Sequence, residues 1–187
     1  MNDIIIVIGI APCLEEDLFN ITSSSLYLFD YMAIGVDCSD RVLFDIQHAA
    51  SYHPDEFIEF KKRRKSIGAN LNYETHSHMN GRLNKGNNTF EEVLVNHIWP
   101  LVAKHPYSGS SSLLGCQAAI GLGYNKVIMC GCPMTGQNPN KKSHYYDVFQ
   151  QGWIKFAPSM FGNKVKSMSG WTKEFLGCPT EEWLQSF

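Results

Sequence analysis

The stretch Ile4-Ile5-Ile6-Val7-Ile8-Gly9 decides the fold class, because it is an unbroken run of β-branched residues that stops at a glycine. A strand with one face in water alternates apolar and polar side chains, whereas a strand buried on both faces is apolar throughout. We therefore predict a central first strand over residues 4–8, followed by a turn that contains Pro12.

Outward from this strand, apolar runs alternate with segments of helical spacing. Strands are predicted at 31–36, 42–52, 69–75, 126–130 and 164–168, and helices at 15–25, 55–67, 91–102, 113–122, 145–157 and 180–187. The segments 79–89 and 133–143 are predicted to be loops. This alternation predicts an α/β fold in which a mainly parallel sheet carries helices on both faces.

Length and charge narrow the class of protein. A chain of 187 residues is expected to form one domain over residues 1–187, since single cores commonly serve up to roughly 250 residues. The formal net charge of -2 lacks the basic excess typical of nucleic-acid binding, so nucleic acid is not an expected partner. No apolar run approaches the ~20 residues of a membrane span, and residues 4–8 are too few for a secretory signal. We expect a cytoplasmic protein without a membrane partner.

The cysteine pattern also favours a cytoplasmic protein. Six cysteines fall at irregular spacings, several inside apolar runs, as reduced buried thiols do. The one close pair, Cys130-Gly131-Cys132, has a single-residue spacer that suits zinc poorly, and no second pair follows it. We predict core cysteines there, with no metal ligand assigned.

A serine cluster, Ser108-Gly109-Ser110-Ser111-Ser112, precedes the helix predicted at 113–122. Free N–H groups, hydroxyls and the positive end of the helix dipole would suit a phosphate at this position. The simpler interpretation is that one serine caps the helix and the others face water. The cluster is not a Walker motif, and Gly9-Ile10-Ala11 lacks the rest of a dinucleotide fingerprint.

Segments that follow strands should meet at one edge of the sheet, where ligands bind in open α/β folds. Histidines are frequent in these segments and titrate near neutrality, so they are candidates for proton transfer. The candidates are His53, His76, His78 and His144. For His48, His97 and His105 we prefer the simpler interpretation of loop or surface histidines that hydrogen-bond the backbone.

Two other interpretations of the polar residues stay open. His76 and His78 stand two apart on an extended segment and could bind a metal with Asp37 or His53, although backbone-bonded histidines are the simpler explanation. A hydrolase-like enzyme would need a carboxylate nucleophile, and Asp37, Asp40 and Glu74 are available, with nothing that singles one out.

Two stretches carry a resemblance to a known family. The residues Gly9-Ile10-Ala11-Pro12-Cys13-Leu14 look like the Gly-x-Gly-Pro-Ser-Leu turn of the family 42 sialyltransferases and the pterin-diphosphokinase-like proteins. Ser108-Gly109 and the stretch from Ala118 to Gly131 resemble their Ser-Gly, helix, Leu-Gly-Tyr, strand and Gly unit. The chain departs from the pattern at Ala11, at Cys13, and at residues 35–37, where an asparagine is expected.

This resemblance implies a three-layer Rossmann-like fold in which the first turn and the Ser-Gly loop hold a nucleotide or nucleotide sugar. By position, His144 would be the histidine that acts as a base. The residues expected to hold the ligand are Gly9, Ala11, Pro12, Asp37, Ser108, Gly109, Ser110, Ser111 and Gly131.

A second resemblance spans most of the chain. The order of His53-Pro54, His76-Ser77-His78, the Ser-Gly unit and the segment from Ser167 to Pro179 looks like that of uncharacterised tailed-phage proteins. It implies a viral gene product that acts inside a bacterium, without naming an activity.

These observations lead to a nucleotide- or nucleotide-sugar-handling, transferase-like protein of phage type that acts on a small phosphorylated molecule, with His144 or His53 moving a proton. A glycosyltransferase-like or a nucleotidyl or diphosphoryl transferase activity would fit. The alternative is a non-catalytic protein that sequesters a nucleotide-derived host signal. Whether the chain forms a homo-oligomer stays open, and we expect the aromatic residues of the last segment to pack on the core: Trp171, Phe175, Trp183 and Phe187.

Overall fold

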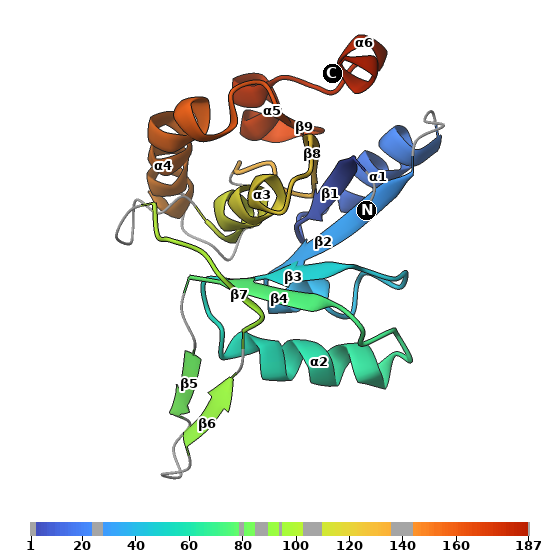
Figure 1. Cartoon of the computed structure of the whole chain (residues 1–187). Coiled ribbons are helices and arrows are strands. Elements are labelled where there is room, and N and C mark those ends of the chain that lie inside the picture. The colour runs from blue at the N-terminus through green and yellow to red at the C-terminus, as the bar shows by residue number, and fades with distance from the viewer. Residues whose placement is uncertain are drawn as a thin grey trace.

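A parallel seven-stranded sheet is the centre of the protein (Figure 1). The computed structural model describes residues 3–23, 28–78, 81–84, 90–93, 95–102, 110–135 and 144–186, with the backbone alone described at 81–84, 90–93, 144 and 145. The strand order is β7-β4-β3-β2-β1-β8-β9. The strands are β1 Ile4–Ile8, β2 Phe29–Ile34, β3 His48–Ala50, β4 Glu74–Ser77, β7 His97–Ile98, β8 Lys126–Cys130 and β9 Val165–Ser167.

The helices that follow or precede these strands form two outer layers. They are α1 Leu14–Ser23, α2 Glu56–Ser66, α3 Ser111–Gly121, α4 His144–Phe161, α5 Gly170–Leu176 and α6 Glu181–Gln185, with a short 3-10 helix η1 at Val36–Cys38. Figure 1 shows α2 on one side of the sheet and α3 and α4 on the other. The prediction of a three-layer, Rossmann-like α/β fold with a parallel sheet is confirmed.

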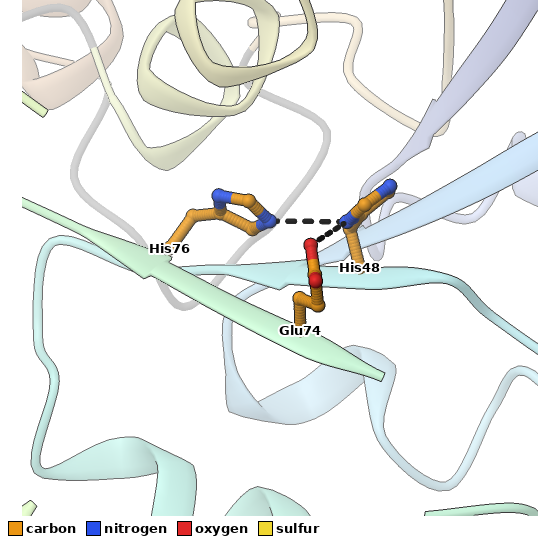
Figure 2. Close-up of side chains that lie close together, drawn as sticks. All are labelled: His48, Glu74 and His76. Atoms are coloured by element: carbon orange, nitrogen blue, oxygen red, sulfur yellow. Dashed lines mark hydrogen bonds and ion pairs between the residues drawn. The ribbon is translucent and has the colours of Figure 1, made fainter. Parts of the chain in front are cut away.

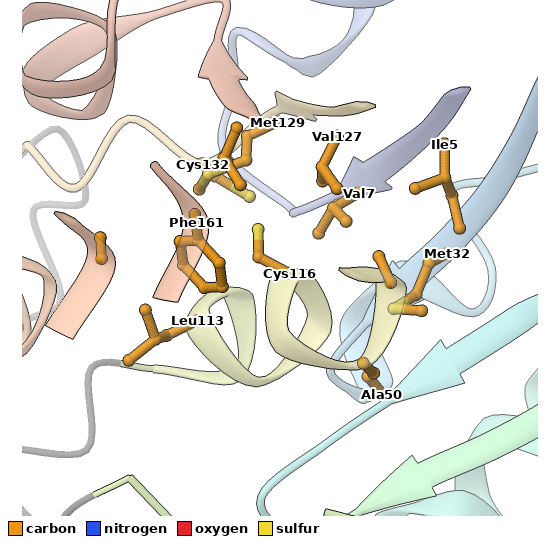
Figure 3. Close-up of a cluster of buried hydrophobic side chains, with 14 of the residues drawn as sticks. Ile5, Val7, Met32, Ala50, Leu113, Cys116, Val127, Met129, Cys132 and Phe161 are labelled. Carbon is orange, nitrogen blue, oxygen red and sulfur yellow. The ribbon is translucent and has the colours of Figure 1, made fainter. Parts of the chain in front are cut away.

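Alternate residues of β1 belong to two cores, one on each face of the sheet. Ile4, Ile6 and Ile8 pack with residues of α1, α2 and α6. Ile5 and Val7 pack with residues of α3 and α4 (Figure 3). All five side chains are buried, so the continuous apolar run that opens the chain is explained by burial on both faces.

The strand order places β1 at a point where the chain reverses its direction across the sheet. From β1 the chain builds outward through β2, β3 and β4 to β7, and α3 then carries it back to β8 on the other side of β1. The loops after β1 and β8 therefore run to opposite sides, which leaves a crevice at the carboxyl ends of these strands.

Both edges of the sheet are short. Strand β7 has two residues and β9 has three. Pro100 lies directly after Trp99 beyond the end of β7.

The helix predicted at 91–102 is wrong. The chain forms β6 at Phe90–Val93 and β7 at His97–Ile98 instead. Strand β6 pairs antiparallel with β5, Gly81–Asn84, so the loop predicted at 79–89 also contains a strand. Strand β7 pairs with β4, and this long-range pairing outweighs the helical spacing of the apolar residues.

Two further expectations concern buried side chains. Trp183 is buried in one core, and Trp171 and Phe175 pack against the other, as expected, while Phe187 lies outside the described residues. Cys130 and Cys132 are buried free thiols, which confirms their prediction as core cysteines.

Candidate functional site

A cavity of about 850 Å³ lies beyond the carboxyl ends of the strands. Its walls come from the segments after β1, β2, β3, β4 and β8, and from the first turns of α3 and α4. This is the crevice that the reversal of strand order creates, and it is where α/β sheets of this kind bind ligands. The volume falls within the roughly 300–1,000 Å³ of small-molecule sites.

One wall of the cavity is formed by the turns after β1 and β8, which touch each other closely. The N–H of Gly9 donates to the carbonyl of Cys130 at 2.8 Å, and the N–H of Ala11 donates to that of Gly131 at 3.1 Å. A Cβ on Gly9 would lie 2.3 Å from the oxygen of Gly131. Only glycine permits this approach, so the glycine of the turn at residues 9–14 is explained by packing alone.

A buried carboxylate anchors the same turns. Asp17 is 4% exposed and accepts hydrogen bonds of 2.8 Å from the N–H of Gly131 and from the hydroxyl of Ser169. The Cys13 thiol lies 3.2 Å from the Ser169 hydroxyl. Burial raises the pKa of Cys13, so the thiol stays protonated at neutral pH and is a poor nucleophile. Asp17 thus fixes the loops after β1, β8 and β9 relative to one another.

The amino end of α3 opens into this cavity. Ser110 is the N-cap residue, but its side chain makes no capping bond and instead contacts the hydroxyl of Ser112. Ser111 accepts a long hydrogen bond of 3.5 Å from the N–H of Tyr52. The first intrahelical bond runs from Leu114 to Ser110 at 3.2 Å, so the N–H groups before Leu114 have no acceptor inside the helix. This helix end therefore presents donors and a positive dipole to the cavity.

Charged groups of both signs line the cavity, and the two carboxylates already have partners. Asp37 lies 3.4 Å from the guanidinium of Arg63. Glu56 accepts a hydrogen bond of 2.8 Å from the Ser51 hydroxyl. Arg41 lines the cavity as well, and its side chain donates to the carbonyl of Ile10 at 3.2 Å, which holds a positive charge beside the first turn.

Two histidines face the cavity from the loops after β3 and β4. His53 and His78 both line it, and the His78 ring lies 5.5 Å from the ring of Tyr52. The Nδ1 atom of His78 is buried and has no hydrogen-bond partner among the described residues. Burial, followed by the nearby His53, lowers the pKa of His78. A neutral imidazole with a free nitrogen can accept a proton from a bound molecule.

Most residues expected to hold a ligand come together here. Those that line the cavity are Gly9, Ala11, Pro12, Asp37, Ser110, Ser111 and Gly131, together with the proposed proton carrier His53. Ser108 and Gly109 lie outside the described residues. His144 begins α4, whose Tyr146 and Phe149 line the cavity, but its side chain lies outside the described part.

A second polar cluster lies away from the cavity, on the face of the sheet that α3 covers. The indole N–H of Trp99 donates to Nδ1 of His76 at 3.1 Å. Nε2 of His76 is 3.1 Å from Nδ1 of His48, whose Nε2 is 3.1 Å from the hydroxyl of Tyr124. Tyr124 donates to Asp30 at 2.7 Å. Because an indole can only donate, both imidazoles carry their proton on Nε2, and the bonds run in one direction from Trp99 to Asp30.

The prediction of a backbone-bonded loop or surface histidine is wrong for His48. The side chain of His97 is partly exposed, as predicted, but its ring bonds a side chain and not the backbone. His48 is 5% exposed and bonds to side chains only. His97 lies in β7 and bonds the carboxylate of Glu74 at 3.0 Å. The group of His76 with His78 and Asp37 or His53 does not form either, because among the described residues His76 joins His48 and Glu74 (Figure 2). His105 lies outside the described residues.

Burial sets the protonation of this second cluster. It lowers the pKa of His76 to about 3, with the neighbouring His48 and His97 adding to the effect. It lowers the pKa of His48 as well, and it raises the pKa of Tyr124, to which the hydrogen bond with Asp30 also contributes. All three side chains are therefore neutral at neutral pH, as their hydrogen bonds require.

Sequence patterns predicted neither the contacts of Asp17 nor this second cluster. Asp17 sits in the acidic first turn of α1, which a helix dipole explains without any contact to Gly131.

No family model, curated protein or solved structure matches the chain. No helix in the described ranges is long and apolar enough to cross a membrane.

Proposed function

We propose that the chain binds a nucleotide or nucleotide sugar in the cavity at the carboxyl ends of its strands and acts on it as a transferase-like protein. The observation that carries the proposal is the meeting of the α3 amino end with the glycine turns after β1 and β8 around one cavity. Helix N–H groups, hydroxyls and turn amides are the groups that bind phosphate oxygens.

The cavity also suits the rest of such a ligand. Tyr52, Tyr146 and Phe149 contribute aromatic surface to its lining, and a base or sugar ring packs well on aromatic faces. Arg41 supplies a positive charge beside the Gly9 turn, which favours a phosphate over a neutral molecule. The phosphates would therefore lie between α3 and the turns, with the ring system toward α4.

Proton transfer would use a histidine of the lining. His53 and His78 both line the cavity, which supports either one as the proton carrier. His144 stays a proposal from the family resemblance. The resemblance to tailed-phage proteins is the basis for proposing that this activity operates in an infected bacterium.

Calorimetry with nucleotides and nucleotide sugars tests the proposal. The double variant Ser110→Ala with Ser111→Ala should bind about tenfold more weakly, because two hydroxyls that can donate to phosphate are lost. Ser159→Ala is the matched control, since this exposed serine of α4 bonds only its own helix at the Phe156 carbonyl. Absence of binding to every nucleotide and nucleotide sugar, or equal affinity in both variants, would contradict the proposal.

A non-catalytic role is the second candidate. Its support is that Asp37 and Glu56, the carboxylates of the described lining, are both engaged with Arg63 and Ser51. A sequestering protein needs donors and a closed shape but no group that attacks the ligand. Incubation with a labelled nucleotide or nucleotide sugar, followed by denaturation, separates the two roles: the ligand returns intact from a sequestering protein and altered from a transferase.

A further inference from the structure

The cluster of His48, Glu74 and His76 has the composition and the spacing of a metal site (Figure 2). Nδ1 of His48 lies 3.1 Å from Nε2 of His76 and 3.7 Å from a carboxylate oxygen of Glu74. All three ligand atoms fall within 4.8 Å of one another. Two nitrogens and one oxygen thus surround a single point.

These spacings match the requirement of one small ion. A tetrahedral Zn²⁺ with bonds of about 2.0–2.1 Å holds its ligand atoms roughly 3.3 Å apart. The two distances that involve His48 lie on either side of this value. The third distance, from the Glu74 oxygen to Nε2 of His76, can shorten to the same value, because the Glu74 side chain is 53% exposed and can rotate toward His76. We propose that His48 Nδ1, His76 Nε2 and Glu74 bind one Zn²⁺, with a water molecule as fourth ligand.

The surroundings of His48 and Glu74 support these two as ligands. A histidine that binds zinc through one nitrogen usually donates its other N–H to an oxygen acceptor, which fixes the ring. Nε2 of His48 has such a partner in Tyr124, which in turn donates to Asp30. Nε2 of His97 lies 3.0 Å from Glu74 and can orient the carboxylate.

The hydrogen bond of Trp99 to His76 leads to a specific prediction about the zinc-bound state. When Nε2 of His76 binds a metal, its Nδ1 carries the proton and becomes a donor. The indole N–H of Trp99 is also a donor and lies 3.1 Å away, so the two groups can no longer bond. Binding of Zn²⁺ therefore requires Trp99 to release His76, and the indole reports on the site.

This site is independent of the proposed function. His48 and Glu74 are the first residues of β3 and β4, at the amino ends of the strands, whereas the cavity lies beyond their carboxyl ends. The exposed side chain of Glu74 gives the ion a path from solvent. Loss of nucleotide binding would leave this proposal unaffected.

Zinc titration of chelator-treated protein is the direct test. We expect one Zn²⁺ per chain, a rise in the unfolding temperature with added Zn²⁺, and a change in tryptophan fluorescence. Glu74→Gln should bind at least about tenfold more weakly and lose the temperature shift. The control Glu16→Gln, an exposed residue of α1, should behave as wild type. Both variants change exposed side chains, so their folding is not at risk.

A second variant and a second ion examine the geometry. Trp99→Phe removes the competing donor and should bind Zn²⁺ about threefold to tenfold more tightly. Co²⁺ in the same site should give the strong visible absorption of a tetrahedral complex. Absent Zn²⁺ binding, binding that Glu74→Gln leaves unchanged, weaker binding by folded Trp99→Phe, or an octahedral Co²⁺ spectrum would each overturn the proposal.

Discussion

Two polar regions of the protein differ in how completely their groups are hydrogen-bonded. On the face of the sheet that α3 covers, Trp99, His76, His48, Tyr124 and Asp30 form a largely buried chain in which each polar side chain bonds the next. At the carboxyl ends of the strands, the N–H groups of the α3 amino end before Leu114 have no acceptor inside the helix, and Ser110 and Ser111 line a cavity. Buried polar groups with complete partners specify structure, whereas groups that converge on a cavity without partners are candidates for ligand binding.

Removal of the Tyr124 hydroxyl should give the largest loss of stability. Tyr124→Phe takes an acceptor from His48 and a donor from Asp30, both buried, and should lower the free energy of unfolding by about 2–4 kcal/mol. Tyr146→Phe, at the cavity wall, should change it by less than about 0.5 kcal/mol. Urea denaturation of both variants measures this difference, and equal losses would contradict the distinction between the bonded cluster and the cavity wall.

Gly131→Ala tests the rigid wall of the cavity. Gly131 has φ of 66° and a Cβ there would lie 2.9 Å from the Gly9 carbonyl oxygen, so we expect a loss of about 2–3 kcal/mol. Gly162→Ala is the control, since Gly162 has φ of 54° and no atom within 4 Å of a Cβ. The free energy of unfolding of Gly162→Ala should fall by only roughly 1–2 kcal/mol, the cost of placing alanine at a positive φ. Equal losses would show that the close approach of the two turns contributes nothing.

The protonation of His76 predicts a pH dependence of stability. Its pKa in the folded protein is lowered from 6.5 to about 3, so the unfolded chain binds more protons between these values. Stability is therefore complete above about pH 6.5 and falls as the pH drops toward 3, by at most about 1.4 kcal/mol per pH unit from this residue.

Urea denaturation between pH 4.5 and 6.5 measures this slope. His76→Asn should be less stable than wild type at every pH but should show a shallower slope, since the remaining slope comes from other groups. An unchanged slope in that variant would remove His76 as its source.

The smallest effect should come from Arg63, which pairs with Asp37 beside the cavity. Arg63→Gln removes a positive charge from an exposed pair, so the unfolding midpoint should barely move. The Asp37 carboxylate would then repel an anionic ligand more strongly and weaken nucleotide binding by less than about tenfold at low salt. This difference should vanish at high salt, because exposed charges are screened. A salt-independent change would point to a role in shape and not in charge.

The fold was predictable where burial leaves a local mark. The apolar runs of β1 and β8 are visible in the sequence because both strands are buried along their whole length. The small-residue segment that forms α3 is visible because most of its residues are buried. Segment 91–102 failed because its short apolar spacing fits a helix as well as strands, and its pairing partner β4 is remote in sequence.

The candidate site divides in the same way. Gly9, Ser110 and His53 follow strands or precede a helix, so topology alone brings them to the cavity. The bonds of His48 to His76 and Tyr124, 28 and 76 residues away, leave no local pattern. The contact of Asp17 with Gly131 could not be predicted, because an acidic residue in the first turn of a helix is already explained by the helix dipole.

The short edges of the sheet have a consequence for association between chains. An exposed strand offers unpaired N–H and C=O groups to which another strand can add, which is the first step toward fibrous aggregation. Strands β7 and β9 have only two and three residues, and Pro100 beyond β7 has no N–H to offer. A sheet that ends in such brief strands has little backbone to which a strand of another copy could add, although its central strands β1 and β8 are apolar and buried along their length.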